Sequence, residues 1–329
     1  MLRRYLIAFT ILFLVGCLFL VGGCSEPTDE GVGDNQVEDV TTVTIKNSTL
    51  TWVKGPFNGT RVQYRTFYSS AAQAEVSYHI YTPELYDTDE ERNYPVLYWL
   101  HGTGGGETGT AIAWLSDYFN NAINSGKIPP IIVIFPYGMM NSMWVDSYDG
   151  SIPMETVIVK ELVPHIDETY RTITSPEGRL IEGFSMGGYG SARLGFKYHD
   201  VFGAISILGA GPVQERLIET PRATPEEREA LLENIYGGDM EYFVAVSPRK
   251  MAEKNAADLQ KNNIIIRLVV GDIDETYKHN HEFHEYLTQL DIPHDFTVLP
   301  GVEHRAPLYL NTLGENNWEF YNTVFGEGM

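Results

Sequence analysis

The sequence predicts a single large α/β domain with a mixed, mostly parallel sheet, helices on both faces and antiparallel strands at its N-terminal side. Segments 62–67 and 76–81 alternate with period two, as half-exposed antiparallel strands do. Near-continuous apolar runs follow at 96–100, 131–135, 180–181, 204–208 and 264–270. Runs that are apolar on both faces are typical of central parallel strands covered by helices.

Helix candidates separate these runs, which completes the α/β alternation. They lie at 154–170, where we expect Pro164 to interrupt a turn, at 185–198 and at 281–290. The stretch 212–263 is too long for a simple connection between strands. Its Thr224-Pro225-Glu226-Glu227 is a helix start, and a second helix is expected after Ser247-Pro248. We expect a helical, cap-like insertion over the carboxyl edge of the sheet, with plain structural filler as the alternative.

Composition limits the classes of partner. The 329 residues are 43% hydrophobic and 20% charged, which is ordinary for a globular protein. The formal net charge of -21 repels phosphate backbones and anionic bilayers, so we expect no binding to nucleic acid. Strongly anionic substrates are disfavoured for the same reason.

The N-terminus carries the pattern of a secretory signal. Arg3 and Arg4 precede an apolar run, and small residues then precede Cys24. We expect residues 1–23 to be a lipoprotein signal peptide and Cys24 the lipid-attachment residue, with Cys17 as the alternative. An uncleaved membrane anchor over 6–23 is the competing interpretation. Both interpretations place the protein outside the cytoplasm. With a lipoprotein signal, the protein is expected to be lipid-anchored to a bacterial membrane or cell surface.

A tether and a catalytic domain follow the signal. Residues 24–43 are acidic, hold no Lys or Arg and have little apolar content, so we expect a flexible tether there. The remaining 44–329 form the predicted domain, and its first strand is expected at 42–45. Both cysteines lie upstream of this domain, so no disulfide framework is expected within it.

The strongest chemical signal is Gly-Phe-Ser-Met-Gly-Gly at 183–188. It follows the strand at 180–181 and precedes a helix-like stretch rich in small residues, the context that a nucleophile elbow requires. The serine of such an elbow sits in a strained turn, so the positions two before and two after it must be small. Ser185 is therefore the candidate nucleophile, and the helix N-terminus behind it favours negative charge.

A glycine-rich loop at 101–106 comes directly off the strand at 96–100. Its glycines let the backbone approach a bound group closely. We expect the backbone N–H groups of Thr103 and Met186 to form an oxyanion hole. A phosphate-binding loop is the rival interpretation, but no Gly-Lys-Ser/Thr follows.

A serine nucleophile needs a base, and in this arrangement the chain order is serine, acid, histidine. His304 follows the expected strand 295–299 and a Pro-Gly turn, which places it at the same edge of the sheet as Ser185. The acid should end the strand 264–270, where Asp272 and Asp274 are both within reach. Asp274 is favoured.

Two further sets of residues could belong to a site. His279, His281 and His284 lack a usual metal-ligand spacing, so we expect no metal and no cofactor. The other set, His101, Tyr137 and Trp144, is expected to line a substrate pocket with aromatic walls. Ordinary packing of these rings is the alternative.

Together these segments resemble the putative esterase family of α/β-hydrolases, which groups feruloyl and acetylxylan esterases, siderophore esterases, S-formylglutathione hydrolases and mycolyltransferase-like proteins. The resemblance covers residues 76–325 and is carried by 98–105, 144–147, 161–167, 183–188, 271–274 and 301–304. In this family the acid typically ends a Gly-x-x-Asp loop, which matches Asp274. Glu303 is a departure, since small or polar residues are more usual beside the base.

The resemblance implies an α/β-hydrolase fold and ester hydrolysis through an acyl-enzyme, with Ser185, Asp274 and His304 as the catalytic residues. With secretion, it favours a feruloyl or acetyl esterase whose substrate is an acylated plant polysaccharide. A siderophore trilactone esterase and a sugar acyltransferase remain alternatives. A non-catalytic surface-binding protein that kept the fold is a further alternative from a different class.

Overall fold

The computed structural model describes residues 51–326. The predicted signal peptide 1–23, the tether 24–43, the lipid site at Cys24 and the strand at 42–45 lie outside the described residues. No helix within 51–326 is long and apolar enough to cross a membrane.

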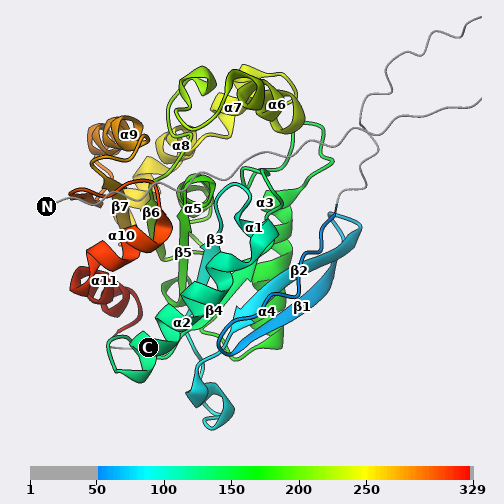
Figure 1. The fold of residues 1–329 in the computed structure, drawn as a ribbon, viewed down its shortest axis with the longest axis vertical. Helices are drawn as coiled ribbons and strands as arrows, with labels where there is room; N and C mark the ends of the chain where they lie inside the picture. Colours follow the sequence, from blue (N-terminus) through cyan, green and yellow to red (C-terminus); the bar gives the residue numbers. More distant parts are fainter. Residues whose placement is uncertain (1–50, 327–329) are drawn as a thin grey trace, which may run out of the picture. The chain divides into compact units, whose positions relative to one another are not determined.

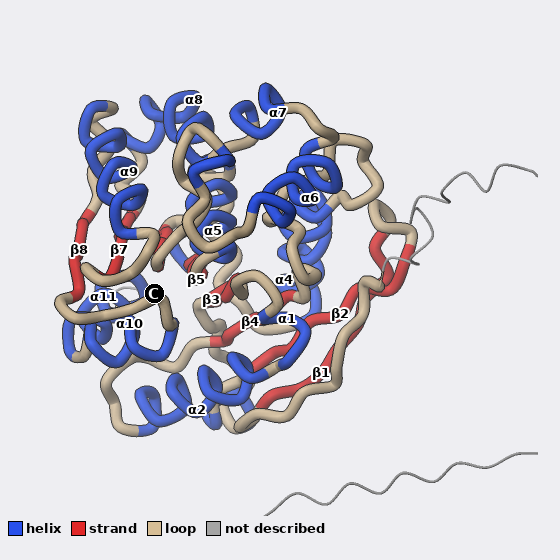
Figure 2. The backbone as a smooth tube through the Cα atoms, turned by 45° about the horizontal axis from the view of Figure 1, so that its top comes forward, coloured by secondary structure: helices blue, strands red, loops and turns tan. Residues whose placement is uncertain are grey.

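One eight-stranded sheet organises the described part of the chain, in the order β1-β2-β4-β3-β5-β6-β7-β8 (Figures 1 and 2). β1 and β2 form an antiparallel hairpin, and β2 is antiparallel to β4. From β4 to β8 every neighbouring pair is parallel, which confirms the predicted mixed sheet. The strands are β1 (Val62–Ser69), β2 (Ala74–Tyr81), β3 (Val96–Leu100), β4 (Ile132–Pro136), β5 (Arg179–Phe184), β6 (Ala204–Leu208), β7 (Ile265–Gly271) and β8 (Asp295–Leu299).

Helices cover both faces of the sheet (Figure 2). Alternate residues of each strand point to opposite faces, so Tyr98 packs in the core on one side and Trp99 in the core on the other. The first core includes residues of α4 (Val163–Thr169), α5 (Met186–Lys197), α8 (Pro248–Lys261) and α9 (Tyr277–Gln289). The second includes residues of α2 (Thr110–Asn124), α10 (Ala306–Leu313) and α11 (Glu315–Phe325). The remaining helices are α1 (Gly105–Thr108), α3 (Met154–Thr156), α6 (Pro225–Tyr236) and α7 (Met240–Ala245), with 3-10 turns η1 (Glu84–Asp87), η3 (Pro176–Gly178) and η4 (Leu217–Glu219).

The helix predicted at 154–170 is not broken at Pro164. It runs as α3, a π-helical stretch η2 (Val157–Leu162) and α4, with Pro164 in the first turn of α4. Proline lacks an N–H and its ring crowds the carbonyl four residues earlier. The wider π-helical turn just before it accommodates both effects. The chain therefore stays helical where an interruption was expected.

The segment 212–263 divides into two parts with different roles. α6 begins with the expected signal: Thr224 and Glu227 form a reciprocal capping box. This first part lies over the carboxyl ends of the strands. α8 instead packs against α5, as the crossover helix that a parallel connection from β6 to β7 needs. Only the first part resembles the expected cap.

A buried ionic network joins the middle of the sheet to α11. Glu182 of β5 and Arg267 of β7 form an ion pair at 2.7 Å, with side chains 0% and 5% exposed. Tyr321 donates a hydrogen bond to the second Glu182 oxygen, and Asn317 accepts one from Arg267. The Phe320 ring stacks on the guanidinium. Because each charge has its partners, the pair is tolerated beneath the turn that carries Ser185.

We expect Arg267→Met to lower the free energy of unfolding by about 3–5 kcal/mol, because it leaves the Glu182 carboxylate buried without a cation. Urea unfolding at pH 7 measures this change. The double variant Arg267→Met/Glu182→Gln should recover part of the loss. A single variant within about 1 kcal/mol of the wild type would contradict this account of the network.

Candidate active site

The turn after β5 holds Ser185 in a conformation that side chains rarely adopt. Its φ is 62° and its ψ is -117°, and α5 begins at the next residue. A Cβ on Gly183 would lie 2.3 Å from the carbonyl oxygen of Gly187, and one on Gly187 would lie 1.8 Å from that of Leu100. Neither position accepts a side chain. The steric requirement behind the Gly-x-Ser-x-Gly pattern is therefore present in this turn.

The structure brings Ser185, His304 and Asp274 together. His304 Nε2 lies 2.9 Å from Ser185 Oγ, and His304 Nδ1 lies 2.7 Å from Asp274 Oδ2. Since a carboxylate only accepts hydrogen bonds, Nδ1 carries the proton and Nε2 is left to accept from the serine hydroxyl. The His304 side chain is 6% exposed and that of Asp274 is fully buried.

Asp274 is held as a carboxylate by its donors. Burial acts to raise its pKa, but hydrogen bonds from His304, from Thr276 and from the Tyr309 hydroxyl outweigh burial and hold the pKa below its usual value. Thr276 donates both its N–H, at 2.7 Å, and its hydroxyl, at 2.6 Å, to Oδ1. Neither Thr276 nor Tyr309 was predicted, because a hydroxyl that serves a distant carboxylate leaves no local pattern in the sequence.

Asp272, the alternative candidate for the acid, has a different hydrogen-bond partner. Asp272 Oδ1 accepts a hydrogen bond from the N–H of Gly301, at 2.6 Å, in the turn that leads from β8 to His304. Asp272 therefore fixes the loop that carries the histidine and does not contact its ring. Glu303, the departure from the family pattern, is 54% exposed at its side chain and lies 3.4 Å from Arg305. It faces solvent.

Three other histidines that follow Ser185 in the chain have partners outside the triad. His279 contacts the carbonyl oxygen of Glu219, and His284 lies 2.8 Å from His294. No group of three or more metal-ligating side chains converges anywhere in residues 51–326.

A cavity of about 560 Å³ opens at Ser185. Its lining is mostly apolar and comes from three places: the glycine-rich loop with the chain after β4, the loops around the triad, and the first part of 212–263. The lining residues are Gly102, Thr103, Met140, Asn141, Met143, Phe184, Ser185, Gly211, Pro212, Thr220, Pro221, Arg222, Ala223, Glu227, Ala230, Leu231, Asn234, Ile235, Thr276 and His304. Thr103 is thus at the cavity, and Met186 opens α5, where the first N–H groups have no acceptor within the helix.

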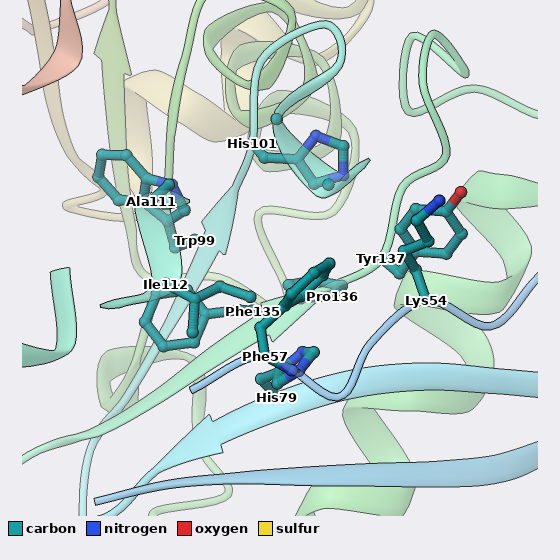
Figure 3. Close-up of a pocket in the computed structure, with 12 residues that line it drawn as sticks. Lys54, Phe57, His79, Trp99, His101, Ala111, Ile112, Phe135, Pro136 and Tyr137 are labelled. Atoms are coloured by element: carbon teal, nitrogen blue, oxygen red, sulfur yellow. Dashed lines mark hydrogen bonds between the residues drawn. The ribbon is translucent and has the colours of Figure 1, made fainter. Parts of the chain in front are cut away.

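The predicted pocket residues His101, Tyr137 and Trp144 do not line this cavity, which corrects that expectation. Trp144 is fully buried, with Nε1 donating to the carbonyl oxygen of His101. Tyr137 donates to Glu107 of α1 at 2.6 Å. With His101 it lines a separate small cavity that also includes Phe57 and His79 (Figure 3). The rings pack behind the glycine-rich loop rather than in front of it.

His101 holds the glycine-rich loop through both ring nitrogens. Nδ1 lies 2.8 Å from the carbonyl oxygen of Gly102, so it carries the proton and donates. Nε2 accepts from the N–H of Gly138 at 3.0 Å. Burial lowers the pKa of His101 to about 4, which outweighs the opposing effects of the Gly102 hydrogen bond and of Glu107. The ring is therefore neutral at pH 7 and fixes the residue that precedes Thr103.

This burial predicts a pH dependence of stability. An unfolded histidine binds a proton near pH 6.5, whereas folded His101 binds one only near pH 4. The contribution of His101 to folding stability is therefore constant above pH 6.5 and falls as the pH drops from 6.5 to 4. In His101→Gln the drop in the free energy of unfolding between pH 7 and pH 4 should be smaller by on the order of 3 kcal/mol. Urea unfolding at pH 7, 5.5 and 4 measures this difference. An unchanged difference between pH 7 and pH 4 would disprove the buried, neutral state.

The chain is similar in sequence to known proteins. Over 176 residues the chain is 31% identical to an endo-1,4-β-xylanase/feruloyl esterase of Xylanibacter ruminicola, covering 50% of this chain and 24% of that protein. It is 28% identical over 264 residues to an esterase of Mycobacterium tuberculosis, covering 74% and 56%. The chain thus spans less than two thirds of either relative.

A solved structure of a ferulic acid esterase superposes with a TM-score of 0.65 at 25% identity, covering 80% of this chain and 98% of that one. The predicted α/β-hydrolase fold is confirmed. The family model described as "Putative esterase" matches residues 69–322, and the chain accordingly belongs to this esterase family.

Proposed function

We propose that the protein is a serine carboxylic-ester hydrolase that works through an acyl-enzyme and releases feruloyl groups from plant polysaccharide. The observation that carries the proposal is the hydrogen-bonded series Ser185–His304–Asp274, which opens into a cavity large enough for an aromatic acyl group. The chain's membership of an esterase family supports the reaction class.

In the proposed first step, Ser185 Oγ attacks the ester carbonyl carbon while His304 Nε2 accepts the hydroxyl proton. The imidazolium formed is stabilised by the Asp274 carboxylate, which its donors keep ionised. The negative charge that develops on the carbonyl oxygen lies in reach of the backbone N–H groups assigned to Thr103 and Met186. His304 then gives its proton to the leaving alcohol, and the acyl group remains on Ser185.

The second step repeats the chemistry with water. His304 removes a proton from the water as it attacks the acyl-enzyme, and Ser185 leaves with that proton. The acid diffuses out, and the triad returns to its starting protonation state. All groups in this scheme come from the chain, so it uses no cofactor.

The size of the cavity supports a feruloyl group over an acetyl group. An acetyl group would leave most of a cavity of about 560 Å³ unfilled. A feruloyl ring offers flat apolar area for Met143, Leu231 and Ile235, and such contacts are the main source of binding energy in apolar sites. Asn141 and Asn234 add amide groups for the polar substituents of the ring or for the sugar.

The proposal includes an extracytoplasmic location. It rests on the sequence of the first 24 residues, in which a basic and apolar leader precedes Cys24. An enzyme that acts on plant polysaccharide must meet its substrate outside the cell. Mass spectrometry of the membrane-extracted protein for a lipidated Cys24 tests this part separately.

We expect Ser185→Ala and His304→Ala each to reduce kcat on 4-nitrophenyl butyrate by at least about a thousandfold, because each removes a partner of the acyl-transfer step. Circular dichroism and the melting temperature serve as the folding control. A fluorophosphonate probe should label the wild type at Ser185 and leave Ser185→Ala unlabelled. A labelled Ser185→Ala variant, or a His304→Ala variant with wild-type kcat, would overturn the assignment.

The acyl preference is tested by narrowing the cavity. Ala230 lines it from α6, so Ala230→Trp should lower kcat/KM for methyl ferulate by about tenfold or more while changing 4-nitrophenyl acetate hydrolysis much less. Glu229→Trp, on the same helix but outside the lining, is the matched control. The feruloyl assignment is wrong if wild-type enzyme hydrolyses acetylated xylan but not methyl ferulate.

A further inference from the structure

The Tyr309 hydroxyl occupies a buried position behind the triad. It donates a hydrogen bond to Asp274 Oδ2 at 2.5 Å, the same oxygen that accepts from His304 Nδ1. Tyr309 belongs to α10, which begins two residues after His304, and its side chain is fully buried. The residue therefore links the acid to the segment that carries the base.

The direction of the Tyr309 hydrogen bond is fixed by a second contact. The N–H of Gly271, at the end of β7, donates to Tyr309 Oη at 2.9 Å. Because that interaction uses an oxygen lone pair, the hydroxyl proton is free to point at the carboxylate. Gly209 leaves room for the group, since a Cβ there would lie 2.9 Å from Oη.

The same ring also contacts the residue before the nucleophile. Tyr309 meets Phe184 edge-on at a centroid distance of 5.1 Å, and Phe184 packs against the His304 ring at 4.5 Å. Tyr309 thus contacts Asp274 directly, and through Phe184 it packs next to His304 and Ser185. Its hydroxyl, however, contacts only Asp274 and the Gly271 N–H among these groups, which lets a single-atom change isolate the hydrogen bond.

We propose that Tyr309 is a positioning residue whose hydroxyl orients the Asp274 carboxylate and limits the negative charge that it presents to His304. The inference rests on the proposed function, in which His304 is the base. With the hydroxyl present, Oδ2 shares its charge between the phenol and the imidazole. Without it, Oδ2 has the imidazole as its main partner, and the imidazolium is stabilised more strongly.

Other charged groups near His304 stay unchanged when the hydroxyl is removed. Glu275 pairs with Arg222 at 2.9 Å, and Arg305 lies 3.4 Å from Glu303, both pairs being largely exposed. The carboxylate of Asp272 accepts from the Gly301 N–H. A change in the acid limb of the pH profile on loss of the Tyr309 hydroxyl is therefore assigned to Asp274.

The test is Tyr309→Phe, which keeps the ring and removes one oxygen. Steady-state kinetics on 4-nitrophenyl butyrate from pH 4.5 to 9 give kcat, KM and the acid limb of kcat/KM. We expect kcat to fall about tenfold with KM changed less than about twofold, because orientation of the base is lost but the cavity is intact. The acid limb of kcat/KM should move up by about half a pH unit, because the Asp274 carboxylate loses the donor that shares its negative charge.

Tyr321→Phe is the matched control. Tyr321 is also a fully buried tyrosine whose hydroxyl donates to a carboxylate, Glu182, at 2.8 Å. It lies on α11 outside the cavity lining, so its loss should lower the melting temperature and leave the acid limb unmoved. Equal shifts of the acid limb in both variants, or wild-type kcat and pH profile in Tyr309→Phe, would overturn the proposal.

Wild-type enzyme and Ser185→Ala measured alongside keep the two claims apart. If Ser185→Ala retains turnover, the proposed function fails whatever Tyr309 does. If Ser185→Ala is inactive and Tyr309→Phe behaves like the wild type, only the positioning role fails.

Discussion

The turn at Ser185 combines a positive φ with two glycines whose neighbours leave no space for a side chain. Such a conformation costs on the order of 1–3 kcal/mol and persists only where the surroundings hold it. Here β3, β5, β6 and α5 do so: Gly187 lies against the carbonyl of Leu100, and the Ser185 N–H donates to Leu208. A change of the Ser185 φ to a more common value would disturb β3, β5 and β6. The Ser185 hydroxyl therefore stays at the edge of the sheet.

The triad depends on this same edge, because β5, β7 and β8 are parallel and end together. Ser185 follows β5, Asp274 follows β7 and His304 follows β8. Their separation is thus set by hydrogen-bonded strand spacing and by a few loop residues. Asp272 and Gly301 pin one of these loops, while Thr276 and Tyr309 fix the carboxylate itself.

The sequence was sufficient to predict the sheet, the elbow and the three residues that meet there. The sheet follows from strand periodicity, the elbow from small residues around a strained serine, and His304 from the chain order. The choice of Asp274 over Asp272 rested also on the resemblance to the esterase family. The partners of Asp274 follow from no such rule, since Tyr309 lies 35 positions away. Trp144 was misplaced because an aromatic residue near a strand end suits a cavity wall and a core equally well. Here it packs on His101, which the chain alone does not reveal.

One continuous segment, residues 212–235, forms a large part of the cavity lining. Ser185, Asp274 and His304 instead follow the ends of strands. The segment and the triad are stabilised separately. α6 begins with its own capping box, whereas the three triad residues are positioned by the strands of the sheet. A substitution or a short deletion in residues 212–235 can thus change the shape of the cavity without moving Ser185. Exchange of this segment alone would therefore change the space above the site and leave Ser185, Asp274 and His304 in place.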